Sequence, residues 1–89
     1  MQIILNKDYG GFMVPDEICK LLHCDQFDTS MSIRTNPTFI QWIKQKKKNG
    51  EDTDFRVVEI PDNASDYLIE DFDGDEWMYF VVNGKIYEA

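Results

Sequence analysis

The chain has 89 residues and a mass of 10.5 kDa, which is enough for one small domain and too little for two. Hydrophobic residues make up 43% and charged residues 29%, as in folded proteins and unlike disordered ones. The 17 acidic residues outnumber the 9 basic ones, so the net charge is −8 at pH 7. Direct binding to nucleic acid needs Lys and Arg against the phosphates, and this balance disfavours it. We expect a single domain over residues 1–89.

The sequence gives no indication of a membrane or secretion segment. Its longest apolar runs are four or five residues, whereas a helix that spans a bilayer needs about 20. The first residues, Met1–Lys7, lack both the basic region and the long apolar stretch of a signal peptide. We therefore expect a cytosolic protein without membrane contact.

The two cysteines and the single histidine argue against a metal or redox centre. Cys19 and Cys24 lie five residues apart with His23 between them, and no second cysteine pair is present. If both lie on one helix, this spacing places the two sulfurs about 140° apart around its axis. On that geometry they can neither share an ion nor form an unstrained disulfide. We expect ordinary reduced thiols and no cofactor.

The first half of the chain predicts one strand and two helices. Met1–Asn6 has the apolar, β-branched character of a strand, and Gly10-Gly11 then marks a turn. A short helix is expected over residues 15–24, because Pro15 suits its first turn and apolar residues recur with helical spacing. Residues 25–35 show no clean period and read as a polar loop.

The second helix carries clear signals at both ends. Asn36 is a good N-cap, Pro37 a good first residue, and Asn49-Gly50 a good stop after a lysine-rich last turn. The inner face of this helix is expected to carry Phe39, Ile40 and Ile43.

The second half of the chain predicts strands. Four segments have strand character, and Asp73-Gly74 and Asn83-Gly84 are strong hairpin turns between them: Phe55–Ile60, Asp66–Phe72, Glu76–Val82 and Lys85–Tyr87. We expect a meander of these strands with the helices on one face. The predicted fold is α+β, with two short helices on one face of a mainly antiparallel sheet of four to five strands.

Negative charge is concentrated in the second half. Residues 1–50 carry a net charge of +2 and residues 51–89 a net charge of −10. The acids gather around the Asp73-Gly74 turn, at Glu70, Asp71, Asp73, Asp75 and Glu76. Such a surface is usually a solvated face that keeps a small protein soluble. Two sharper interpretations are an acidic mimic of nucleic acid that occupies a DNA-binding or nuclease protein, and a weak divalent-ion site.

The calcium interpretation has a specific weakness. Asp71, Asp73 and Asp75 alternate as at the start of a calcium loop, and strand alternation is expected to place all three on one side. Gly74 precedes the third acid instead of following it, and the expected later Glu is missing.

Aromatic residues of the strand after this turn form a second candidate binding feature. Trp77 and Tyr79 share one side of the strand, and Met78 and Phe80 share the other. One set is expected to pack in the core. If the Trp77–Tyr79 side is exposed, its acidic margins suit a protein contact or a homodimer seam. If both sides are buried, the aromatics are structural.

Catalysis finds no support in the sequence. Gly10-Gly11 lacks the Lys-Ser/Thr and the third glycine of a phosphate-binding loop. The paired acids fall in a turn that is expected to be wet, whereas an acid–base pair needs one carboxyl desolvated. We do not expect an enzyme.

Three segments, in chain order, carry a resemblance. They are Asn6-Lys7-Asp8-Tyr9-Gly10-Gly11-Phe12, Val57-Val58-Glu59-Ile60-Pro61-Asp62 and Asp71-Phe72-Asp73-Gly74-Asp75-Glu76, with a looser match at Arg34-Thr35-Asn36-Pro37. On these motifs the chain resembles a group of small uncharacterised proteins of phage and prophage genomes, over about residues 3–77. It departs from them at Pro15, where a capping Ser is usual, and in the hairpin after Trp77. The resemblance implies a phage accessory protein in the host cytosol and transfers no catalytic residue.

Together these features predict a non-enzymatic module that binds a host or phage protein. Its candidate binding residues are the five turn acids with Trp77 and Tyr79, together with the loop of Tyr9, Gly10, Gly11 and Phe12. The alternatives are the acidic nucleic-acid mimic and a small-ligand or divalent-ion binder that uses the turn acids and this loop.

Overall fold

The computed structural model describes residues 1–89 and has an α+β fold, as predicted. Three helices are present, α1 (Asp16–Leu22), α2 (Met31–Arg34) and α3 (Pro37–Lys48). The five strands are all antiparallel and divide into two sheets. One sheet pairs β1 (Gln2–Asn6) with β2 (Phe55–Glu59), and the other has the order β3 (Asp66–Phe72), β4 (Asp75–Val82), β5 (Lys85–Glu88).

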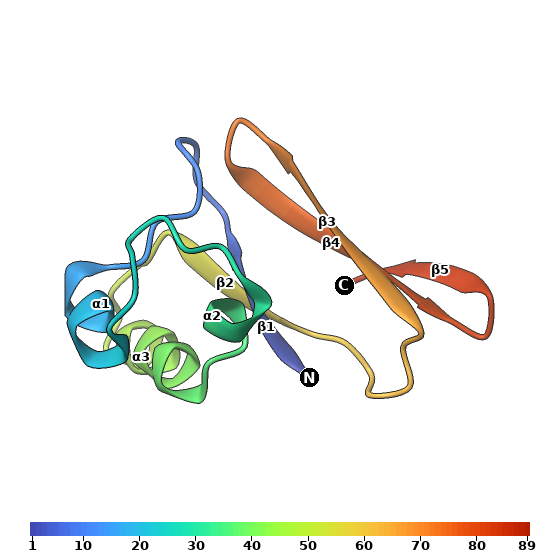
Figure 1. Cartoon of the computed structure of the whole chain (residues 1–89), viewed down its shortest axis with the longest axis horizontal. Coiled ribbons are helices and arrows are strands. Elements are labelled where there is room, and N and C mark those ends of the chain that lie inside the picture. Colours follow the sequence, from blue (N-terminus) through green and yellow to red (C-terminus); the bar gives the residue numbers. More distant parts are fainter.

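The elements form three layers, with the β1–β2 sheet in the middle (Figure 1). The helices cover one face of this sheet and the β3–β4–β5 sheet lies on the other side. Strand β1 is therefore buried on both faces. Ile4 joins a cluster of aliphatic and aromatic residues under the helices, while Ile3 and Leu5 join a second cluster with Met78 of β4. Because successive side chains of a strand point to opposite faces, β1 contributes to both hydrophobic clusters.

Helix α3 follows its sequence signals closely. The Asn36 side chain accepts hydrogen bonds from the N–H groups of Thr38 and Phe39, and Gly50 takes a positive φ of +78° after the last turn. Phe39, Ile40 and Ile43 are buried as predicted. None of the three helices is both long enough and apolar enough to cross a membrane.

Two features of the fold differ from the prediction. The expected loop at residues 25–35 contains the four-residue helix α2, which is too short to show a period in the sequence. The strand β2 does not join the C-terminal meander. It pairs with β1, with Ile4 opposite Val57, so the expected single sheet is two sheets. This pairing joins segments about fifty residues apart, and no turn signal reveals it.

The two hairpin turns of the second sheet are as predicted. Asp73 and Gly74 have φ values of 51° and 97°, and Asn83 and Gly84 have values of 52° and 76°. Two successive positive φ angles are typical of the tight turn that matches strand twist. These turns fix the register of β4 against both neighbours.

Candidate functional site

The Gly10–Gly11 loop and the Asp73–Gly74 turn are in direct contact. The N–H of Gly10 donates to the carbonyl of Asp73 at 2.9 Å. A Cβ added to Gly74 would lie 2.8 Å from the nitrogen of Gly10 and closer still to that of Gly11. Gly10 and Gly11 themselves have φ values of 100° and 93°. Gly74 is needed because a Cβ would block this close approach, and Gly10 and Gly11 are needed for their positive φ angles. Both roles are structural.

A buried ion pair lies beside this contact. Arg34 donates from Nη1 and Nη2 to the two carboxylate oxygens of Glu76, both at 2.8 Å. Glu76 also accepts from the N–H of Asn6 at 2.7 Å. Arg34 in turn lies over the ring of Phe12, 4.3 Å from its centroid, and donates to two backbone carbonyls. Every polar atom of the pair has a partner, which makes its burial tolerable.

Glu76 and Phe12 are therefore not surface residues, contrary to the sequence-based expectation. Glu76 is buried because Arg34 neutralises it, and Phe12 is buried in the core under the helices. The acidic patch expected at the turn is correspondingly smaller. In the sequence Arg34 is an isolated arginine in a predicted loop, and nothing near it indicates that it pairs with Glu76.

The remaining turn acids are exposed but do not share one side. Asp71 lies opposite Glu76 and Asp75 lies opposite Phe72 in the β3–β4 register, so these two acids are on opposite faces. Asp73 is in the turn itself. The expectation that all three acids lie on one side was wrong because the turn reverses the chain between them. No group of three or more His, Cys, Asp or Glu side chains is arranged to hold a metal ion.

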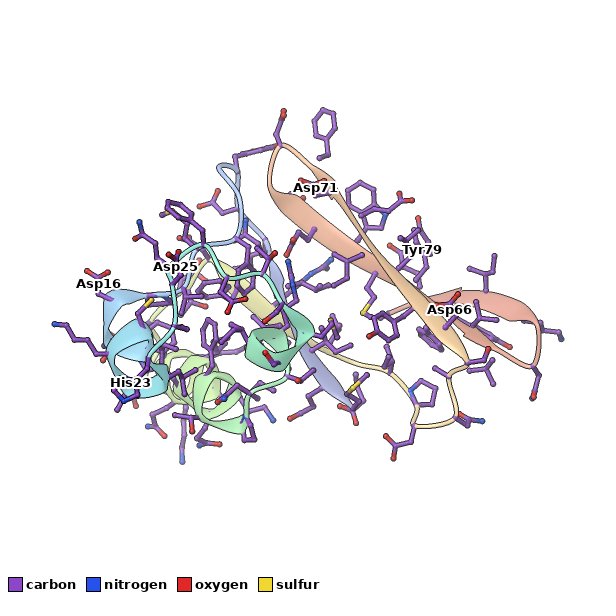
Figure 2. The ribbon with its side chains drawn as sticks, viewed as in Figure 1. Asp16, His23, Asp25, Asp66, Asp71 and Tyr79 are labelled. Carbon is purple, nitrogen blue, oxygen red and sulfur yellow. The ribbon has the colours of Figure 1, made fainter.

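Tyr79 lies on the face of the second sheet that is turned away from the helices (Figure 2). Trp77, two residues earlier on β4, lies on the same face. Met78 and Phe80 occupy the opposite, inner face and pack toward β1. We call the outward-facing side of β3–β4–β5 the outer face. From the register its apolar members are Leu68, Phe72, Trp77, Tyr79, Val81 and Ile86. The expectation of two separate aromatic sides is confirmed.

The outer face has an apolar centre and acidic margins. Trp77, Tyr79 and Val81 run along the central strand β4, and Leu68 and Ile86 flank them with 55% and 73% of their surface exposed. The remaining members are the acids Asp66, Glu70, Asp75 and Glu88, and no member is basic. A shallow hollow of about 380 Å³ lies here, lined in part by Leu68, Tyr79 and Ile86. No helix covers this outer face, because α2 reaches the sheet only from its inner side, through the Arg34–Glu76 pair.

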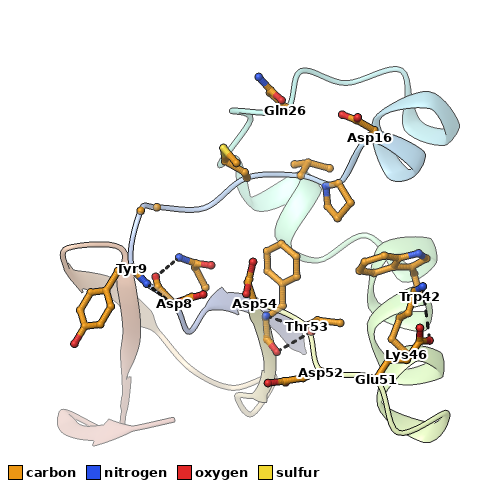
Figure 3. Close-up of a pocket in the computed structure, with 17 residues that line it drawn as sticks. Asp8, Tyr9, Asp16, Gln26, Trp42, Lys46, Glu51, Asp52, Thr53 and Asp54 are labelled. Carbon is orange, nitrogen blue, oxygen red and sulfur yellow. Dashed lines mark hydrogen bonds and ion pairs between the residues drawn. The ribbon is translucent and has the colours of Figure 1, made fainter.

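A second, wetter cleft of about 660 Å³ lies between the Tyr9–Gly11 loop and α3 (Figure 3). Tyr9 stands at one end of the cleft and Trp42 at the other. Trp42 donates to Glu17, and Lys46 lies over the Trp42 ring at 5.4 Å. Of the predicted loop residues, Tyr9, Gly10 and Gly11 thus line this cleft, while Phe12 does not.

Three aspartates of this cleft have unequal environments. The pKa of Asp54 is raised, first by burial of its carboxyl and then by a hydrogen bond with Asp8. The pKa of Asp52 is lowered because Lys7 donates to it at 2.7 Å. The raised pKa means that the Asp54 carboxyl is protonated more readily than an exposed aspartate. His23, the single histidine of the chain, lines no part of the cleft.

A comparison with protein-family models, curated proteins and solved structures finds no match to this chain.

Proposed function

We propose that the chain is a non-enzymatic accessory module that binds another protein through the outer face of its second sheet. The observation that carries the proposal is the apolar centre of this face, from Leu68 across Tyr79 to Ile86, which no other element covers. Large apolar surfaces that stay open to water typically mark interaction sites. The resemblance to small phage and prophage proteins supports a role in a host cytosol.

Charge complementarity indicates the kind of partner. All four charged members of the outer face are acidic, and they lie along its margins at Asp66, Glu70, Asp75 and Glu88. A partner with an apolar patch bordered by Lys and Arg fits this pattern, because opposite charges at a rim guide association and suppress wrong partners. Two copies placed face to face would bring these carboxylates together, which disfavours a homodimer through this surface.

The acidic nucleic-acid mimic is the runner-up. It needs a continuous row of carboxylates, whereas Asp71 and Asp75 lie on opposite faces and Glu76 is neutralised in the interior. The apolar centre also has no counterpart in a phosphate backbone. The small-ligand alternative has the cleft of Tyr9, Asp8 and Asp54 in its favour.

The test is capture of partners from a nuclease-treated bacterial lysate by three forms of the protein. The wild type is compared with Leu68→Lys on the outer face and with Leu21→Lys on α1, two exposed leucines with 55% and 63% of their surface accessible. Neither change removes a buried group, so both variants are expected to fold. A partner of the outer face is retained by Leu21→Lys and lost, at least tenfold, by Leu68→Lys.

Elution with salt separates the two binding modes. Contacts between exposed charges weaken strongly as salt rises from about 50 to 200 mM, because the Debye screening length shortens. A partner held mainly by the apolar centre remains bound above 200 mM and is released by Leu68→Lys. A partner that elutes early and is indifferent to Leu68→Lys would contradict the proposal and favour the mimic.

A further inference from the structure

The end of helix α1 brings Cys19 and Cys24 together. The helix stops at Leu22, and His23 adopts the left-handed conformation with φ 53° and ψ 46°. The N–H of Cys24 then donates back to the carbonyl of Cys19 at 3.2 Å. A bond from the second residue after a helix to the carbonyl five residues earlier is typical of the Schellman motif, a common helix end. In this motif the side chains of the same two residues usually contact each other.

The expectation that the two sulfurs point 140° apart was therefore wrong. It assumed that both cysteines lie on one continuous helix, whereas the chain reverses at His23, one residue before Cys24. Both side chains are half-buried against the same hydrophobic cluster. The pKa of Cys19 is raised, first by burial and then by its interaction with the Cys24 thiol. The thiols are neighbours, and both keep contact with solvent.

We propose that Cys19 and Cys24 form an oxidative modification site, a dithiol that closes to an intramolecular disulfide when it meets a small disulfide oxidant such as glutathione disulfide. The geometry supports it because a backbone hydrogen bond already holds the two residues in register. In the structure both thiols are free, so the dithiol is the starting state.

The reaction balances as two thiol–disulfide exchanges. One cysteine thiolate attacks a sulfur of glutathione disulfide, forms a mixed disulfide and releases one glutathione thiolate. The second cysteine, as thiolate, attacks the protein sulfur of the mixed disulfide and releases the other glutathione. The protein loses two electrons and two protons, and the oxidant becomes two glutathione thiols. Because each attacking species is a thiolate, closure is expected to accelerate as pH rises.

The bridge would fix the end of α1 to the segment that follows it. That segment already contacts the residues that lead into α1, because the N–H of Val14 donates to the carbonyl of Gln26 at 2.7 Å. Closing a short loop restricts the unfolded chain more than the folded one. The oxidised protein is therefore expected to melt several degrees above the reduced protein.

The test is incubation of the intact protein with glutathione disulfide at pH 8, followed by thiol counting and intact-mass measurement. The expected product has no free thiol, a mass lower by two hydrogens and no attached glutathione. Cys19→Ser and Cys24→Ser each retain one thiol and are expected to stop at the mixed disulfide. The same oxidation in 8 M urea provides the comparison for the contribution of the fold.

Closure is expected at a ratio of glutathione disulfide to glutathione at least tenfold lower for the folded chain than for the chain in urea. Equal ratios would overturn the proposal, because they would show that the helix end does not pre-position the thiols. A folded wild-type product with two attached glutathiones, or a disulfide between two copies, would overturn it as well.

Discussion

At the scale of single residues, the Arg34–Glu76 pair connects three parts of the chain. Arg34 ends α2, Glu76 lies on β4, and the N–H of Asn6 on β1 donates to the same carboxylate. The side chain of Asn6 continues the connection by donating to the carbonyls of Asp8 and Gly74. The pair and Asn6 together thus fix the positions of the helical layer, the middle sheet and the hairpin turn relative to one another.

Removing one partner of this pair is expected to be strongly destabilising. Glu76→Gln leaves Arg34 as an uncompensated buried charge, and Arg34→Met does the same to Glu76. Each is expected to lower the free energy of unfolding by about 3–5 kcal/mol, measured by urea denaturation. The double variant Arg34→Met/Glu76→Gln is expected to lose less than the sum of the two, because no charge is then left unpaired.

Lys7→Met provides the matched control. It breaks the Lys7–Asp52 pair, whose carboxylate is exposed, and is expected to leave the free energy of unfolding almost unchanged because solvent screens this pair. If Glu76→Gln proved as mild as Lys7→Met, the Arg34–Glu76 pair would be dispensable for folding.

At the scale of elements, local signals predicted most of the structure. Asn36 and Gly50 delimit α3, and the Asp73-Gly74 and Asn83-Gly84 turns set the hairpins. These features depend on neighbours within a few residues, and capping and turn chemistry are local. The β1–β2 pairing, the two-sheet division and the burial of Glu76 depend on segments far apart in sequence, so the sequence alone did not reveal them.

The candidate site divides in the same way. The alternation of Trp77 and Tyr79 with Met78 and Phe80 followed from strand geometry and was correct. Which side would face water depended on β1 covering Met78, and the sequence left that open. The reversal at His23 that joins the two cysteines was missed because a left-handed histidine is uncommon, so no sequence signal announced the end of α1.

The contact between the two glycine turns makes a second prediction. Gly74→Ala places a Cβ against the backbone nitrogens of Gly10 and Gly11, so the hairpin turn and the Gly10–Gly11 loop must move apart. Gly84→Ala is the matched control, since Gly84 also has a positive φ but nothing lies within 4 Å of its Cβ position. The control is expected to cost about 1 kcal/mol, from backbone strain alone.

Gly74→Ala is expected to cost at least about 2 kcal/mol more than this control, because a backbone shift is added to the strain. Thermal or urea unfolding of the two variants under identical conditions gives the difference directly. Equal losses would show that the Gly10–Gly11 loop moves aside freely.

At the scale of the whole molecule, the layers separate charge as well as structure. The helical layer contains the lysine-rich end of α3, while residues 51–89 hold a net charge of −10. Within the second sheet the acids Asp66, Glu70, Asp71, Asp73 and Asp75 are exposed and have few bases near them in sequence. Mutual repulsion among these charges opposes the compact state, because a net charge far from zero destabilises a fold through self-repulsion.

Screening this repulsion is expected to stabilise the free protein. Raising NaCl from 20 to 300 mM at pH 7 shortens the screening length from roughly 20 Å to about 6 Å, and the melting temperature is expected to rise by a few degrees. The variant Asp66→Asn/Glu70→Gln removes two of the crowded charges and is expected to melt higher at low salt and to respond less to added salt. A melting temperature that falls with salt would mean that attractive pairs such as Lys7–Asp52 outweigh the repulsion.

A partner with a basic rim relieves the same repulsion that salt screens. Complex formation is therefore expected to raise the melting temperature most at low salt.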